Sequence, residues 1–161
     1  MRIDAHQHFW RYDPSLYGWI DDSMGVLWRD FLPADLRPHL RATGQDGAVA
    51  VQARQDEHET RWLLGLAAEH PEILGVVGWV DLCAADLADR LRALRTPHLK
   101  GLRHVLQAEP AAFFARADFR RGLAHLAGTG LVYDMLVYAP QLPLATELCR
   151  AFPGQRFVLD H

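Results

Sequence analysis

Two histidines near the start of the chain, His6 and His8, are the residues whose spacing most directly suggests chemistry. They follow a short apolar stretch that predicts a β-strand, and residues two apart on a strand point to the same face. Both imidazoles can then offer a nitrogen to one point. Imidazole is a common metal ligand and exchanges a proton near neutral pH, so the pair suits a metal ion, a hydrolytic water or a substrate oxygen. On its own, a His-x-His pair also fits a purely structural role.

Further polar residues follow the later predicted strands. Arg103 and His104 lie at the end of one strand, the next strand supplies Asp134 and is followed by Tyr138, and His161 ends the last. The planar guanidinium of Arg103 suits a carboxylate or a carbonyl oxygen that gains negative charge during a reaction. Its structural alternative is an ion pair with Asp134 or Asp81.

Other roles for these candidates follow from their positions and side-chain chemistry. His104 can hold substrate hydroxyls or polarise a carbonyl, and Asp134 can orient an imidazole. Trp10, only two residues beyond His8, is the aromatic residue that we expect closest to a ligand. The alternative for Trp10 is a satellite hydrophobic cluster beneath the irregular aromatic segment at residues 9–32.

Strands and helices alternate along the chain, which predicts a parallel α/β sheet with right-handed crossovers. After the first strand, we expect strands at 46–52, 73–80, 99–105, 131–137 and 156–160. We expect helices at 33–44, 56–69, 84–94, 119–127 and 141–152. Because the carboxyl ends of parallel strands share one edge, the polar residues above should converge there.

The bulk composition narrows the possible function classes. The chain has 161 residues, half of them hydrophobic, with 17 basic and 20 acidic side chains and a net charge of -3. We therefore expect a single domain that binds neither nucleic acid nor a membrane surface. No apolar leader or spanning segment precedes the first strand, and Cys83 and Cys149 lie far apart, which favours reduced thiols and a cytoplasmic location.

Several motifs in order along the chain resemble one enzyme superfamily. They are His6-Gln7-His8-Phe9-Trp10, Gly75-Val76-Val77-Gly78-Trp79, Lys100-Gly101-Leu102-Arg103-His104, Tyr133-Asp134-Met135-Leu136 and Phe157-Val158-Leu159-Asp160-His161. The sequence resembles the amidohydrolase superfamily, in the amidohydrolase-2 branch that contains sugar-acid lactonases of the L-fucono-lactonase, L-rhamnono-lactonase and 4-sulfomuconolactonase types. The resemblance implies a TIM-type (β/α)8 barrel and hydrolysis of the ring ester of a carboxylated lactone.

A complete barrel has eight strands and typically about 250 residues, whereas this chain predicts six. We therefore expect residues 1–161 to form one incomplete barrel domain that lacks the last two βα units. The resemblance then also implies that the aspartate of the eighth strand, which resembles the family's general base, lies outside this sequence. Two unpaired parallel edges would favour association, so a homo-oligomer is one expectation.

The resemblance also implies roles at the site. His6, His8 and His161 become the catalytic histidines, and they can hold one divalent metal ion, zinc being the first choice, although some lactonases of this branch are thought to need no metal. Asp134-Met135-Leu136 replaces a superfamily histidine and Lys100 lies at a strand beginning, so a binuclear centre is not expected. The expected substrate-binding residues are Trp10, Arg103, His104, Asp134 and Tyr138, and the expected partner is a small-molecule lactone.

Two other functions fit the same residues. One is a metal-dependent decarboxylase or other lyase, because that chemistry also uses His-x-His and a later histidine. The other is an inactive remnant that associates through its open sheet edge. A serine hydrolase and a nucleotide-binding protein are disfavoured, because the chain has no G-x-S-x-G, P-loop or G-x-G-x-x-G motif.

Overall fold

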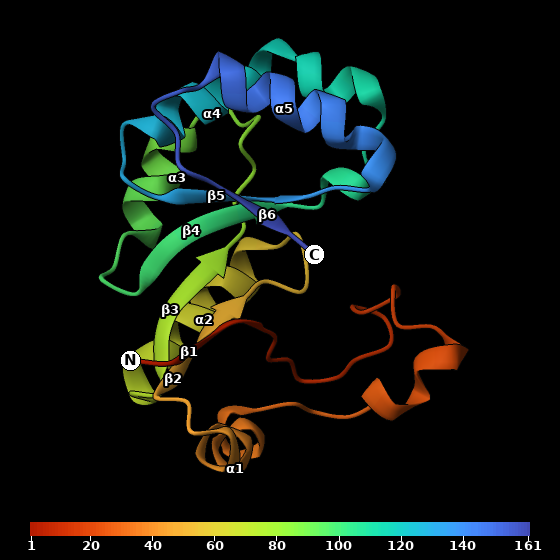
Figure 1. Ribbon diagram of the computed structural model, residues 1–161, viewed down its shortest axis with the longest axis vertical. Coiled ribbons are helices and arrows are strands. Elements are labelled where there is room, and N and C mark those ends of the chain that lie inside the picture. Colours follow the sequence, from red (N-terminus) through yellow and green to blue (C-terminus); the bar gives the residue numbers. More distant parts are fainter.

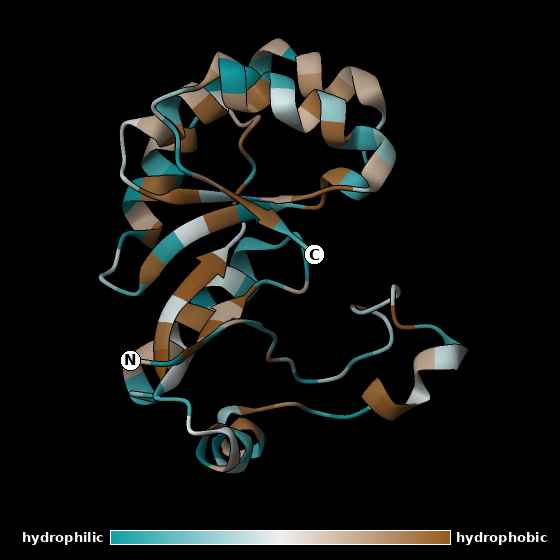
Figure 2. Cartoon of the chain, in the orientation of Figure 1, coloured by the Kyte–Doolittle hydropathy of each residue, from teal (hydrophilic) through white to brown (hydrophobic).

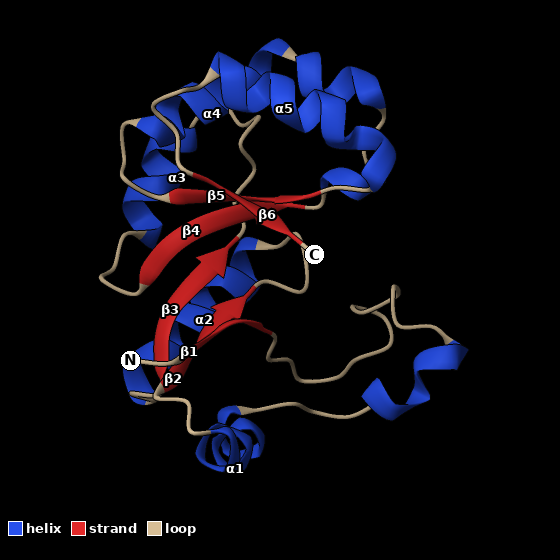
Figure 3. Ribbon diagram, viewed as in Figure 1, coloured by secondary structure: helices blue, strands red, loops and turns tan.

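The computed structural model describes residues 1–161, in which strands and helices alternate (Figures 1 and 3). The strands are β1 (Ile3–Gln7), β2 (Gly47–Val51), β3 (Ile73–Gly78), β4 (Leu99–His104), β5 (Val132–Leu136) and β6 (Phe157–Asp160). The α-helices are α1 (Pro33–Thr43), α2 (Glu57–Glu69), α3 (Leu87–Leu94), α4 (Ala117–Ala127) and α5 (Leu142–Ala151). Short 3-10 turns lie at Asp22–Leu27, Leu106–Ala108, Ala111–Ala115 and Ala139–Gln141. None of the helices combines the length and apolar character needed to cross a bilayer.

The sheet has the order β1-β2-β3-β4-β5-β6, and every neighbouring pair is parallel. This confirms the predicted class, with each strand joined to the next through a helix. The largest difference from the predicted boundaries is at α3, which begins at Leu87 rather than at residue 84, and the other ends differ by two residues or fewer. Residues 81–84 instead form a turn, in which the Asp81 carboxylate accepts a hydrogen bond from the Cys83 amide.

The sheet is strongly curled. β1 and β6 are its two edge strands and do not pair with each other. In a flat sheet they would lie about 24 Å apart, at roughly 4.8 Å per strand spacing. The ring of His6 on β1 nevertheless lies 3.4 Å from the carboxylate of Asp160 on β6. The six strands therefore form an incomplete barrel whose inner face brings the first and last strands together.

The hydrophobic core lies between the strands and the helices on the outside of the curl. Each of the helices α2, α3, α4 and α5 contributes buried side chains to it, as do the outward-facing residues of the strands. Figure 2 shows hydrophobic residues, in brown, along these helices and strands. Phe119, Leu123 and Leu126 of α4 are fully buried. Burial of apolar surface stabilises a fold by about 25 cal/mol per Å² removed from water. The packing of the helices on the outer face of the sheet is therefore the main interaction that stabilises the curled sheet.

Local sequence signals fix the ends of α1. Pro33 occupies the first helical turn, where its missing amide hydrogen is not needed. The Asp35 carboxylate accepts a hydrogen bond from the Leu32 amide, 2.8 Å away. Gly44 ends the helix with φ +67°, a left-handed conformation that glycine adopts without a Cβ clash.

The irregular segment between β1 and α1 packs around a small cluster of its own. Trp10, Tyr17 and Ile20 are buried there, and Trp10 forms a two-residue antiparallel bridge with Phe31. The indole nitrogen of Trp10 donates a hydrogen bond to the Arg29 carbonyl at 2.9 Å. This is the satellite cluster that we gave as the structural alternative for Trp10.

Glu59 near the start of α2 is a buried carboxyl beside this segment. Its Oε2 accepts hydrogen bonds from the Ala53 and Arg54 amides at 3.0 and 2.8 Å, and its Oε1 lies 3.5 Å from the Tyr17 hydroxyl. Burial nevertheless dominates over these bonds and raises the pKa of Glu59 to about 7.

This pKa predicts a pH-dependent stability. Folded Glu59 keeps a proton that the unfolded chain releases near pH 4.5, so the stabilising effect is complete below pH 4.5 and is lost as the pH rises through 7. At about 1.4 kcal/mol per pKa unit, the loss is about 3 kcal/mol. We expect urea unfolding to show that the wild type loses about 2.5 kcal/mol more stability between pH 5 and pH 8 than Glu59→Gln, which keeps an acceptor for both amides. If the unfolding free energies of the two proteins changed with pH in parallel, that result would contradict the raised pKa of Glu59.

Candidate active site

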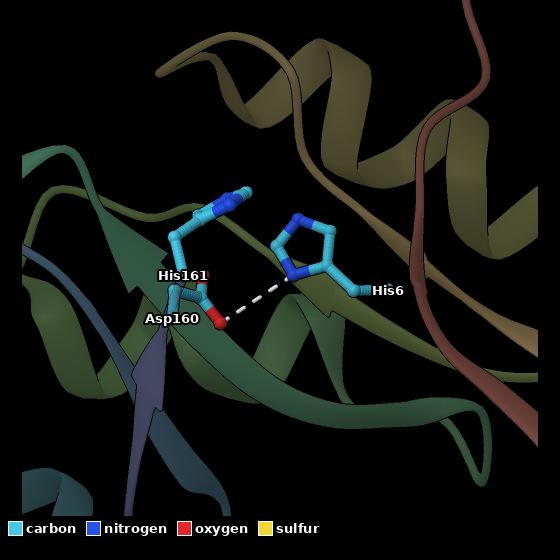
Figure 4. Close-up of side chains that lie close together, drawn as sticks. All are labelled: His6, Asp160 and His161. Carbon is cyan, nitrogen blue, oxygen red and sulfur yellow. Dashed lines mark ion pairs between the residues drawn. The ribbon is translucent and has the colours of Figure 1, made fainter.

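Residues from the first, fourth and sixth strands meet inside the curl at the carboxyl ends of the strands. His6 lies near the end of β1 and His8 just beyond it, Arg103 lies near the end of β4, and Asp160 and His161 end the chain at β6. Figure 4 shows the rings of His6 and His161 beside the Asp160 carboxylate. The predicted convergence of His6, His8 and His161 is thus present, with Asp160 added to it.

The Nε2 atoms of His6 and His8 face each other at 3.3 Å. The Nδ1 atom of His8 lies 2.9 Å from the Val51 carbonyl oxygen, and the Nδ1 atom of His6 lies 3.4 Å from Asp160 Oδ1. Because both of those oxygens are acceptors, they assign the ring hydrogen of each imidazole to Nδ1. Each Nε2 then carries a lone pair, and the lone pair of His6 Nε2 accepts a hydrogen bond from Arg103 Nη1, 3.3 Å away.

Arg103 and Asp160 form a buried ion pair beside the His6 ring. Arg103 Nη1 lies 3.0 Å from Asp160 Oδ2 and 3.3 Å from His6 Nε2, and Nη2 donates to the backbone carbonyl of Gln52. Both charged side chains are about 4% exposed. Burial alone would raise the pKa of Asp160, but its bonds with His6 and Arg103 outweigh that effect and hold the pKa below its usual value.

His161 reaches the site through an unusual backbone conformation. Its φ is +62°, in the left-handed region that non-glycine residues seldom adopt. Its ring lies edge-on to the His6 ring, with the centroids 5.0 Å apart. Ligand atoms of His6, Asp160 and His161 all lie within 4.8 Å of one another.

The protonation of His8 and Asp134 is set mainly by burial. Desolvation lowers the pKa of His8 to about 4, so its ring is neutral near pH 7 and its Nε2 lone pair is available. Desolvation, together with the charge of Asp160, raises the pKa of Asp134 to about 6. Asp134 is the register neighbour of Arg103 on β5, which places it beside the ion pair.

His104 lies next to Arg103 in sequence and has partners on the opposite face of β4. Its Nδ1 accepts a hydrogen bond from the Trp79 indole at 3.3 Å, so its Nε2 donates to Glu109 Oε1 at 2.8 Å. Its ring stacks on Phe113 with the centroids 5.0 Å apart. Both ring nitrogens therefore have protein partners, and a direct contact of His104 with substrate stays a prediction.

The remaining predicted substrate-binding residues lie at different depths. Tyr138 is exposed just beyond β5, whereas Trp10 is buried in the loop cluster. Arg103 has each of its terminal nitrogens engaged within the protein. For these residues, a role in holding substrate also stays a prediction.

The donor set fits a zinc ion. Zinc is bound by imidazole nitrogens at 2.0–2.1 Å in tetrahedral geometry, for which two ligand atoms are separated by about 3.3 Å. The two Nε2 atoms of His6 and His8 have this separation, and the ring hydrogens on the far side of each imidazole are held by oxygen acceptors. Asp160 behind His6 is the kind of outer carboxylate that orients metal-binding histidines.

A curled parallel βα sheet with histidines and carboxylates at the carboxyl ends of its strands defines a protein of the parallel α/β-barrel class with a histidine-rich strand-end site. The chain belongs to the amidohydrolase family, because the family profile described as Amidohydrolase (Amidohydro_2) matches residues 3–161. This confirms the family resemblance that the ordered motifs indicated.

Two curated relatives align with this chain over essentially its whole length. The L-fucono-1,5-lactonase of Burkholderia multivorans is 47% identical over 163 residues, which cover 100% of this chain and 55% of the relative. The L-fucono-1,5-lactonase of Burkholderia ambifaria is 35% identical, with 99% of this chain and 56% of the relative covered. The chain thus spans about half the length of these relatives.

Solved structures agree with the fold. A crystal structure of an amidohydrolase from Burkholderia multivorans with bound zinc is 47% identical and has a TM-score of 0.97, covering 100% of this chain and 57% of that one. A probable 2-pyrone-4,6-dicarboxylic acid hydrolase from Acinetobacter baumannii, 15% identical, has a TM-score of 0.78 over 99% of this chain and 58% of its own. The second likeness bears on the fold alone.

Proposed function

We propose that this chain carries the site of a hydrolase that opens the ring ester of a sugar-acid lactone and yields the open hydroxy acid. The observation that carries the proposal is the pair of His6 and His8 Nε2 lone pairs, 3.3 Å apart, in front of a buried Arg103–Asp160 ion pair. The L-fucono-1,5-lactonases that are 47% and 35% identical to this chain support the substrate class.

A zinc ion would be held by His6, His8 and His161, and Asp160 would orient His6. When bound there, zinc would activate water and polarise the ester carbonyl. The relative whose crystal structure contains zinc supports this choice of metal.

The chain's own residues would position the metal ligands and the substrate. Asp160 would hold the Nδ1 hydrogen of His6, so that a zinc ion could take the His6 Nε2 lone pair in place of the Arg103 Nη1 donor. Arg103 fixes Asp160 and gives the site a positive charge near an oxygen that becomes negative in ester hydrolysis. Asp134, whose pKa is raised to about 6, is mostly ionised at pH 7 and would accept a hydrogen bond from a sugar hydroxyl.

The test compares His8→Ala with His39→Ala, whose histidine lies exposed on α1. We expect His8→Ala to bind zinc at least tenfold more weakly in a competition titration with a chelating dye. We also expect its zinc-loaded form to release acid from L-fucono-1,5-lactone at least tenfold more slowly. His39→Ala should match the wild type in both measurements, and excess chelator should abolish acid release by the wild type.

Each contrary result identifies a different error. Equal turnover by His8→Ala and the wild type would show that the pair of His6 and His8 takes no part in the reaction. Release of carbon dioxide from a carboxylated substrate would show that the protein is a lyase and would contradict the proposed hydrolase function. Tight zinc binding without turnover of any sugar-acid lactone would overturn hydrolysis by this chain and favour an inactive remnant.

A further inference from the structure

A second concave site lies at the opposite end of the sheet from the candidate active site. It is a hollow of about 590 Å³ between α3 and α4, bounded by the first residues of β4 and β5. The loops that lead into these two strands lie together at the left of Figure 1, away from the end marked C. Volumes of about 300–1,000 Å³ are typical of sites that hold small molecules.

The charges around this hollow all have one sign. Its lining includes the cationic side chains of Arg92, Arg95, Lys100 and Arg156, together with His125, and contains no Asp or Glu. The whole chain has more acidic than basic residues, 20 against 17. A concave surface lined by one sign of charge concentrates the field and attracts ligands of the opposite sign.

Local structure accounts for only part of this positive charge. Arg92 pairs with Asp89, and both Arg92 and His125 lie in the last turns of α3 and α4, where cations offset the partial negative charge of a helix end. One nitrogen of Arg156 donates to the Gly130 carbonyl, which leaves its remaining donors free. Arg95 and Lys100 form no ion pair within the chain, so the hollow keeps an uncompensated positive charge.

The rest of the lining suits an organic molecule rather than a bare ion. Leu91, Leu99, Leu131 and Val132 provide apolar surface. Thr96 also lines the hollow, and its hydroxyl oxygen accepts a bond from the His98 amide, so its hydrogen can be donated to a ligand.

We propose that this hollow binds a small organic anion with two or more negative charges, independently of the lactone site. Its anionic groups pair with Arg95 and Arg156, whose planar forks match phosphate and carboxylate oxygens equally well. Its carbon skeleton lies on the leucine and valine surface. Phosphate esters and polycarboxylates share this chemistry, so the experiment separates them.

The test is isothermal titration calorimetry of metal-free protein at low salt with pyrophosphate, propane-1,2,3-tricarboxylate and, as a neutral control, glucose. We expect one of the two anions to bind at one site per chain and glucose not to bind. The double variant Arg95→Gln/Arg156→Gln should weaken that binding at least tenfold. Arg41→Gln, which removes an exposed charge on α1, should change it less than twofold.

Binding of pyrophosphate alone would assign a phosphate ligand, and binding of the tricarboxylate alone a carboxylate ligand. Absence of binding by both, or equal binding by the double variant, would overturn the proposal. Because the double variant could lose structure, Arg95→Gln is measured as well. Arg95 is exposed and forms no ion pair, so an intact Arg95→Gln with unchanged affinity would also count against the site.

Discussion

Replacement of Arg103 by alanine is expected to lower the free energy of unfolding by about 3–5 kcal/mol, measured on metal-free protein by urea unfolding. The substitution removes the only cation that pairs with Asp160 and leaves that carboxylate buried. It also removes donors to the Gln52 carbonyl and to His6. Losing one partner of a buried pair costs far more than the net contribution of the pair, because the remaining charge keeps its desolvation penalty.

Two further variants separate this cause from a general loss of packing. Arg103→Ala/Asp160→Asn removes the stranded charge, so we expect it to be more stable than Arg103→Ala alone. Arg92→Ala breaks the exposed pair with Asp89 and should leave the urea midpoint unchanged. A single variant Arg103→Ala as stable as Arg92→Ala would show that the inner ion pair contributes nothing to folding.

The same substitution, glycine to alanine, is expected to have opposite effects in two helices. In α4, a Cβ on Gly122 would lie 2.1 Å from the backbone oxygen of Leu82. Backbone atoms cannot rotate away as the end of a flexible side chain can, so α4 must shift away from the turn at residues 81–84. We expect Gly122→Ala to destabilise the protein by about 3 kcal/mol, at the upper end of typical overpacking costs.

The matched control is Gly65→Ala in the middle of α2, where a Cβ would meet nothing within 4 Å. Alanine is a better helix former than glycine by about 1 kcal/mol, so this variant should be slightly more stable than the wild type. Thermal unfolding of both variants measures the difference. A stabilised Gly122→Ala protein would contradict the close approach of α4 to Leu82.

The order of strands and helices could be predicted because each element has its own signal. Apolar runs, the capping residues around α1 and the glycines after helices all act locally. The facing of His6 and His8 was predictable for the same reason, since alternate residues of one strand share a face. Their meeting with His161 depended on the family resemblance, because sequence alone does not show how far a sheet curls.

The role of Asp160 was missed for a physical reason. Neighbouring residues on an extended strand point to opposite faces, so a strand that ends with His161 in the site would direct Asp160 away from it. The left-handed φ of His161 breaks this alternation and allows both side chains to reach His6. A single backbone angle of this kind has no signature in an Asp-His dipeptide.

The same alternation bears on Arg103 and His104. Both were predicted to bind substrate, yet Arg103 points into the curl and His104 packs against Phe113 on the helical side. Adjacent positions on one strand could have indicated that they face different surroundings. The engagement of both terminal nitrogens of Arg103 by Asp160, His6 and Gln52 could not be predicted, because it depends on contacts between strands far apart in the sequence.

The curl of the sheet also determines when the histidine centre can form during folding. His6 and Asp160 are about 150 positions apart in the sequence, and Arg103 is 97 positions from His6. Contacts this distant form only after the entropy of closing long loops has been offset by the pairing of the intervening strands. We therefore expect the centre to assemble in the last steps of folding. In a refolding experiment, high-affinity zinc binding should arise later than the bulk of the secondary structure.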